Sequence, residues 1–170
     1  MAMPSEPEVW LRGPIPGFLP ELMPVAHALL QIREEIGGVP ATISFERLWR
    51  KPAGAGSVAF HLRHLAGSLD RLLTYARGEA LSESQRAALA DEARPGRPEE
   101  DADGLRRAAI AAIDRALDQV RATPVETLRE PRQVGTERLP STVLGLLFHA
   151  AEHAQRHAGQ IATTIKFVNG

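Results

Sequence analysis

The amino-acid sequence predicts an all-α protein, built as a four-helix bundle in a single domain of residues 1–170. Four segments repeat apolar residues at the three-to-four-residue spacing of an amphipathic helix with one face in the core. Glycine and proline residues separate these segments, and no segment alternates apolar and polar residues as a strand does. We therefore expect helices near residues 21–36, 57–77, 104–122 and 139–168, with long loops after the second and the third.

The composition excludes several classes of function. A net charge of −1, without a long basic segment, gives no electrostatic footprint for nucleic acid or for an anionic membrane. No apolar run approaches the roughly 18 residues that indicate a membrane-spanning helix. The absence of cysteine excludes disulfides, thiolate ligands and a cysteine nucleophile, and leaves histidines and carboxylates as metal ligands. We expect a cytoplasmic protein that binds neither nucleic acid nor membrane.

The N-terminal segment, residues 1–20, is predicted to be an extended arm on the surface. It contains five prolines, and it lacks the basic start and the uninterrupted apolar run of an export signal. The first helix follows from Glu21 to Ile36 and ends at two glycines. His27 lies in this helix, where a single histidine is more often a boundary residue than a metal ligand.

The second helix contains the first pair of candidate ligands, His61 and His64. Ser57 is a favourable residue to begin this helix, and its apolar stripe runs to Ala76. At about 100° per residue, His61 lies roughly 60° and His64 roughly 120° from the centre of the stripe. Burial on the stripe favours His61, but a flanking position in a bundle can also face the space between helices. Helical geometry leaves the choice open.

The middle of the chain is predicted to be polar and exposed. Residues 81–93 are compatible with a helix but polar, and residues 94–104 form a loop rich in proline, glycine and acidic residues. The charged residues of the third helix are interpreted as a solvated face. Residues 123–140 are expected to connect the third helix to the last.

The last helix places His149, His153 and His157 at a spacing of four. Each step of four advances the azimuth by about 40°, so the three rings form one slanted row. His153 and His157 point toward the predicted core, and His149 lies at its edge. Imidazole nitrogens on a buried face cost free energy unless a partner satisfies them. That partner is either a divalent metal ion or a hydrogen-bonding neighbour.

A third histidine from the second helix would complete an open metal site. His61 or His64, together with His153 and His157, supplies three imidazole nitrogens and leaves one position for water or substrate. Three neutral imidazoles without a thiolate favour zinc or nickel over iron or manganese.

The sequence does not identify a general acid or base. The helical count turns Asp70 and Glu152 to the polar side, so no carboxylate lies on the core face beside the histidines. The motifs of serine hydrolases, P-loop proteins and dinucleotide-binding proteins are also absent. The catalytic residues are therefore unknown at this stage.

Two segments resemble the signature segments of the DinB/YfiT-like superfamily of metal-binding four-helix bundles. They are SVAFHLRHLAGSLDRLL, which begins at Ser57, and HAAEHAQRHAGQI, which begins at His149. In that family one ligand follows a small residue or serine by seven positions and precedes Leu-Ala. The other two form an H-x-x-x-H pair in the last helix, commonly followed by Gly-Gln. The resemblance therefore implies His64, His153 and His157 as the metal ligands.

Three further residues near these segments are implied as neighbours of the ion. They are positioned to hydrogen-bond a ligand or a bound water, or to serve as alternative ligands. These residues are His61, His149 and Gln160.

The resemblance also implies a class of activity. Members of the superfamily include thiol-dependent S-transferases and isomerases, in which the ion activates a low-molecular-weight thiol. Thiol S-transfer to a small-molecule substrate is therefore the leading prediction, and metal-dependent hydrolysis is the next. The alternative without catalysis is a stress-related bundle that the metal merely stabilises. Family members commonly form dimers, so a homodimer through helix faces is expected.

Overall fold

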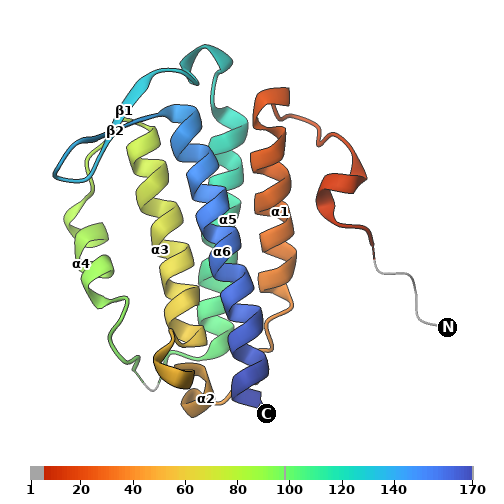
Figure 1. The fold of residues 1–170 in the computed structure, drawn as a ribbon, viewed down its shortest axis with the longest axis vertical. Helices are drawn as coiled ribbons and strands as arrows, with labels where there is room; N and C mark the ends of the chain where they lie inside the picture. Colours follow the sequence, from red (N-terminus) through yellow and green to blue (C-terminus); the bar gives the residue numbers. More distant parts are fainter. Residues whose placement is uncertain (1–5, 98, 170) are drawn as a thin grey trace.

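A computed structural model describes residues 6–97 and 99–169, and this part of the chain is mainly helical, as predicted. Four long helices lie side by side, with α6 between α3 and α1 in the view of Figure 1 and α5 behind them. α1 and α3 each contact both α5 and α6, so the core lies between these four helices. Their bounds are Met23–Gly37 (α1), Val58–Ala76 (α3), Ala102–Ala122 (α5) and Val143–Asn169 (α6).

Local sequence explains where two of the long helices begin. The hydroxyl of Ser57 accepts a hydrogen bond from the backbone N–H of Phe60 at 3.1 Å, which satisfies a free donor in the first turn of α3. The carboxylate of Asp101 accepts in the same way from Gly104 at 2.7 Å and begins α5. Each such cap stabilises its helix by about 1 kcal/mol.

The apolar stripes of the long helices form one continuous core. The largest side chains in it have relative exposures below 2%, and burying each contributes about 1.5–3 kcal/mol. Those from the long helices are Leu29, Ile32 and Ile36 of α1, Val58, Leu62, Leu65 and Leu69 of α3, Ile113 of α5, and Leu147 and Ile161 of α6. The core therefore fixes α3 against α6.

A β-hairpin follows α5 where a loop and the start of a helix were predicted. β1 (Pro131–Val134) pairs antiparallel with β2 (Leu139–Thr142), and α6 begins only at Val143. The expectation that no strands occur and that the last helix begins at residue 139 was wrong. Strands of four residues are too short to show a clear alternation, and Pro140 disfavours helical backbone at the residue before it.

The segment before α1, which contains the predicted arm, packs against α1 in its described part, residues 6–22. It is not extended throughout, because it contains two short 3₁₀ turns, Val9–Arg12 and Pro20–Leu22. Val9 and Phe18 are buried. His27 of α1 lies 2.9 Å through its Nε2 from the carbonyl oxygen of Gly13, so it holds the arm to the helix rather than joining the other histidines. Residues 1–5 lie outside the described part.

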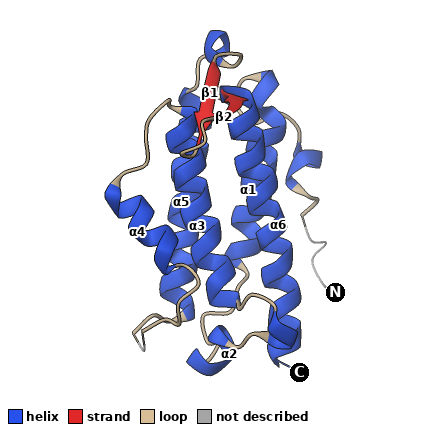
Figure 2. Cartoon of the chain, turned by 60° about the vertical axis from the view of Figure 1, so that its left-hand side comes forward, coloured by secondary structure: helices blue, strands red, loops and turns tan. Residues whose placement is uncertain are grey.

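Two short helices complete the fold. α2 (Phe45–Trp49) lies across one end of the long helices, and α4 (Glu83–Asp91) lies outside α3, apart from the core (Figure 2). No residue of α4 is buried. Polar contacts join it to α3, since the Gln85 amide nitrogen donates to Asp70 at 2.7 Å and to Thr74 at 2.8 Å. Because no α4 side chain is buried in the core, these hydrogen bonds help to hold α4 against α3.

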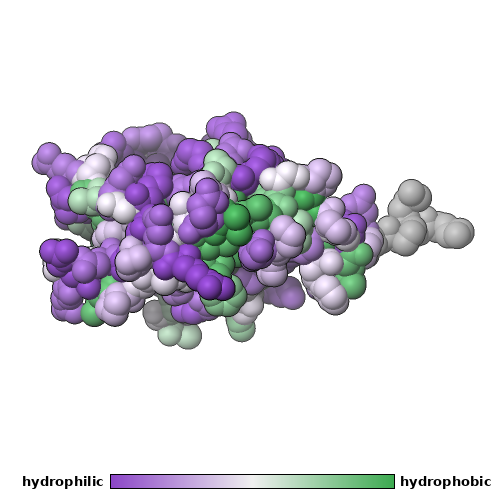
Figure 3. All heavy atoms as spheres, turned by 90° about the horizontal axis from the view of Figure 1, so that it is seen from above, coloured by the Kyte–Doolittle hydropathy of each residue, from purple (hydrophilic) through white to green (hydrophobic). Residues whose placement is uncertain are grey.

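The face of the molecule at the hairpin end is mostly hydrophilic. In the view along the long helices, polar residues surround one larger apolar area near the centre of the face (Figure 3). No helix of residues 6–97 and 99–169 is long and apolar enough to cross a membrane.

Candidate metal centre

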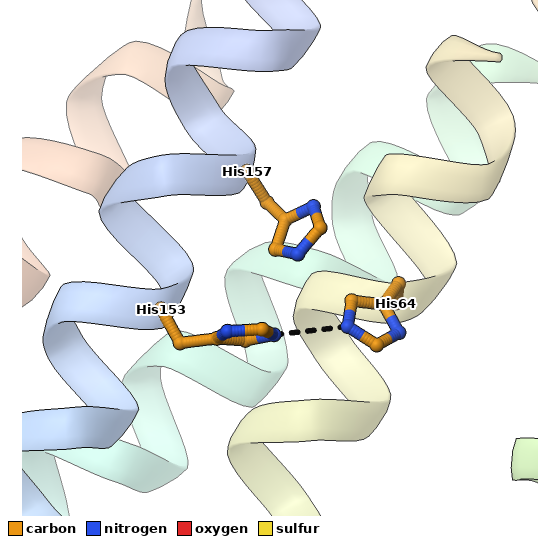
Figure 4. Close-up of side chains that lie close together, drawn as sticks. All are labelled: His64, His153 and His157. Atoms are coloured by element: carbon orange, nitrogen blue, oxygen red, sulfur yellow. Dashed lines mark hydrogen bonds between the residues drawn. The ribbon is translucent and has the colours of Figure 1, made fainter. Parts of the chain in front are cut away.

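Three histidines from two helices converge at the interface between α3 and α6. His64 comes from α3, and His153 and His157 come from successive turns of α6 (Figure 4). One nitrogen from each ring lies within 4.8 Å of the other two, and Nε2 of His64 is 2.9 Å from Nε2 of His153. The spacing of four in the sequence thus puts two rings on one face, and the packing of α3 adds the third.

Glu92 fixes the orientation of the His64 ring. Its Oε2 lies 2.7 Å from Nδ1 of His64, and its Oε1 accepts a hydrogen bond of 2.5 Å from Arg71. A carboxylate that accepts the Nδ1 proton leaves the Nε2 lone pair free, on the side facing His153. Carboxylate, histidine and metal are commonly arranged in this order in metal sites.

The charge of Glu92 is maintained although its side chain is almost fully buried. Burial raises the pKa of this carboxyl group, but the hydrogen bonds from His64 and Arg71 outweigh burial and lower the pKa below its ordinary value. Gly67 makes room for the contact, because a Cβ atom there would clash with Glu92 and lie 2.7 Å from the Arg71 guanidinium. Glu92 is therefore ionised at neutral pH and held by two partners.

Sequence reasoning missed Glu92. The expectation that no carboxylate lies beside the histidines was wrong, because it considered only the helices that contain them. Glu92 follows α4 directly, in a polar stretch where helical periodicity gives no sign of burial. The only signal was an acidic residue at the end of a helix-compatible segment, and surface acids have the same appearance.

His61 lies beside the cluster rather than within it. Its Nδ1 is 3.0 Å from Nδ1 of His157, and it is 5% exposed. Figure 4 shows that the other ring nitrogen of His157 faces the gap between His64 and His153. A proton shared between the two Nδ1 atoms therefore leaves Nε2 of His157 free for that gap. The helical count favoured His61 for burial. The three histidines whose nitrogens lie within 4.8 Å of one another, called the close set below, are His64, His153 and His157.

The environment favours the neutral form of His61, His153 and His157. Burial, reinforced by the nearby His64, lowers the pKa of His157 to about 4 and also lowers the pKa of His61 and of His153. Nδ1 of His153 is buried and has no hydrogen-bond partner among the described residues. Neutral imidazole is the form that binds metal ions.

The two remaining candidates lie at the margin. The side chain of His149 is 50% exposed, and its Nδ1 is 3.3 Å from Glu152. Its ring centroid lies 5.5 Å from that of His153, so it borders the cluster. Gln160 is exposed.

The donor set fits a divalent metal ion. The three nitrogens lie within 4.8 Å of one another, and nitrogens bound at about 2.0–2.1 Å to one tetrahedral zinc ion lie about 3.3 Å apart. Small rotations of the side chains therefore suffice to bring all three to one ion. Zinc and nickel suit such a set.

A cavity of about 280 Å³ opens beside the cluster, between α3, α4 and α6. His64 and His153 form one wall, with His149 at the edge and Arg71 and Tyr75 further along α3. The remaining lining residues are Ser68, Leu72, Leu81 and Leu89. A small molecule in this cavity would lie directly against two of the three histidines.

The fold and the histidine cluster together define a helical protein able to hold a divalent ion. A family model described as the DinB superfamily matches residues 45–161, which include all of α3, α6 as far as Ile161, and the three clustered histidines. The chain belongs to the DinB superfamily. No protein among the curated sequences matches it.

We expect Glu92→Gln to weaken zinc binding by about 10- to 100-fold, because the ring of His64 loses the charge that orients it. A competition titration against a coloured chelator measures the affinity. Glu99→Gln, at an exposed position, is the control and should leave the affinity unchanged. Equal affinity for both variants would show that Glu92 does not support a metal ligand.

Proposed function

We propose that this protein is a metal-dependent enzyme of the thiol S-transferase type. His64, His153 and His157 would hold one zinc or nickel ion within a four-helix bundle formed by α1, α3, α5 and α6. The observation that supports this most is the combination of three converging imidazoles with a cavity that reaches two of them. A bound ion would lower the pKa of a thiol or a water and so supply a nucleophile at neutral pH.

The residues around the cluster would prepare it for such chemistry. Glu92 would keep the Nδ1 proton on His64, and Arg71 would keep Glu92 in place. His61 would orient the ring of His157 as Glu92 orients that of His64. Its Nδ1 would accept a hydrogen bond from the protonated Nδ1 of His157 across 3.0 Å. His64 and His157 would then each present an unprotonated Nε2 toward the gap beside His153.

Two features favour a catalytic over a purely structural site. A structural site is usually closed by a fourth protein ligand, and the close set contains three histidines among the described residues. His61 is the nearest alternative, and its Nδ1 is engaged with Nδ1 of His157. The cavity beside the cluster gives a substrate access to the remaining position. Hydrolysis by an activated water is the second candidate and would use the same position.

We expect His64→Ala, His153→Ala and His157→Ala each to weaken zinc binding by more than the roughly 100-fold limit for a neighbouring residue. His61→Ala and His149→Ala should retain the ion, with at most that weakening. Competition titration gives the affinities, and circular dichroism checks the fold, which should survive because apolar stripes supply the core.

One result would change which histidine of α3 is assigned as the metal ligand. Retention of zinc by His64→Ala, together with loss by His61→Ala, would show that His61 is the ligand and that the motif is displaced by one turn. Loss of helical structure in the three ligand variants, together with the metal, would favour a structural ion.

Cobalt substitution tests thiol activation. We expect cobalt-loaded protein to develop a thiolate-to-cobalt charge-transfer absorption when a low-molecular-weight thiol is added at neutral pH, because cobalt takes the place of zinc and leaves a position open. The His153→Ala variant should show no such band. Absence of the band with every thiol tested would contradict thiol binding at the ion and leave hydrolysis as the proposed activity.

A further inference from the structure

A second cavity continues the one beside the histidines. Its volume is about 880 Å³, and it lies between the C-terminal end of α3, α4 and the hairpin of β1 and β2, which packs beside that end of α3 (Figure 1). Tyr75, Leu81 and Leu89 line both cavities. The two cavities therefore adjoin along these three apolar side chains, and together, with the histidine cluster at one end, they are called the groove below.

The far end of this groove is basic. Arg86 comes from α4, and Arg132 and Arg138 come from the hairpin. Arg132 is already paired with Glu130 at 2.8 Å. Arg86 donates to the carbonyl oxygen of Leu81, and its other donors have no carboxylate within 4.0 Å among the described residues.

Arg138 is the second arginine of this cavity for which the described residues provide no acidic partner. Its Nε donates at 2.5 Å to the side-chain oxygen of Gln133, which is uncharged. The acidic residue of this cavity, Glu79, is paired with Arg77 at 2.8 Å. Two guanidinium groups thus face the groove with uncompensated charge.

The distance from the basic end to the histidines sets the size of a ligand. Tyr75, in the apolar middle, already follows His64 by 11 residues on the same helix, which corresponds to about 16 Å along the helix axis, and the arginines lie beyond it. A molecule that reaches from the cluster to the arginines is therefore larger than a simple alkyl thiol.

We infer that the groove binds an elongated substrate or co-substrate whose oxyanion, a carboxylate or a phosphate, is held by Arg86 and Arg138 while its reactive end lies against the histidine cluster. Guanidinium groups match the paired oxygens of both anions. The apolar middle of Tyr75, Leu81 and Leu89 covers the uncharged part of the ligand. This inference rests on the proposed function, since it identifies what the same site binds.

The test compares three thiols on cobalt-loaded protein: 2-mercaptoethanol, which is short and uncharged, glutathione, which has two carboxylates, and coenzyme A, which has phosphates. We expect at least one anionic thiol to bind about tenfold more tightly than 2-mercaptoethanol, measured by the charge-transfer absorption. The tighter of the two identifies the oxyanion. Equal affinity for all three would overturn the inference.

A double variant assigns the preference to the two arginines. Arg86→Ala with Arg138→Ala should weaken binding of the anionic thiol about tenfold and leave 2-mercaptoethanol unaffected. Arg115→Ala with Arg129→Ala removes the same charge at exposed positions outside the groove and should change either affinity less than about twofold. Equal weakening by both double variants would overturn the assignment.

Calorimetry on metal-free protein separates this inference from the proposed function. S-methylglutathione keeps the carboxylates of glutathione but has no free thiol. Binding that the Arg86 and Arg138 double variant weakens would support the groove even if no thiol produced a cobalt band. A cobalt band with no dependence on either arginine would support thiol activation and overturn the groove.

Discussion

The packing of α3 against α6 is the interaction on which the site depends. Leu62, Leu65 and Leu69 of α3 are fully buried, and Leu147 and Ile161 of α6 are buried with them in one core. Burial of such side chains contributes about 1.5–3 kcal/mol each, which is enough to hold polar rings at the same interface. The imidazoles tolerate this position because each meets another polar group, and because burial lowers the pKa of His61, His153 and His157 and so favours their neutral form.

An outer layer of polar contacts orients what the core has brought together. α4 has no buried residue, yet the residue that follows it, Glu92, is buried against His64 and Arg71. The same short helix contributes Leu89 to the groove and Arg86 to its basic end. The position of one histidine ring and the shape of the groove therefore depend on a helix held by hydrogen bonds, which are individually modest in net energy.

The sequence predicted the helical class, because long apolar stripes are periodic enough to recognise. It also predicted that His153 and His157 share one helix face, since a spacing of four has that consequence in any α-helix. Helical geometry could not choose between His61 and His64, because both lie at the edge of the stripe and the choice depends on how α3 meets α6. The family motif chose His64, which the structure places in the close set.

The features that sequence reasoning missed come from short or polar segments. The hairpin consists of two strands of four residues, too short for a periodic signal. Glu92 is buried by tertiary contacts of a segment that is polar throughout, so nothing local distinguishes it from a surface acid. Gly67 has a role only because a carboxylate from a distant segment packs over it.

The most direct test of the metal site is a crystal structure of untagged protein with anomalous diffraction recorded at the absorption edge of the bound metal. The proposed site predicts one anomalous peak at the point where nitrogens of His64, His153 and His157 meet, with a water or anion from the cavity as the remaining ligand. No peak there in native and zinc-soaked crystals, or a fourth ligand from the protein, would contradict an open three-histidine centre.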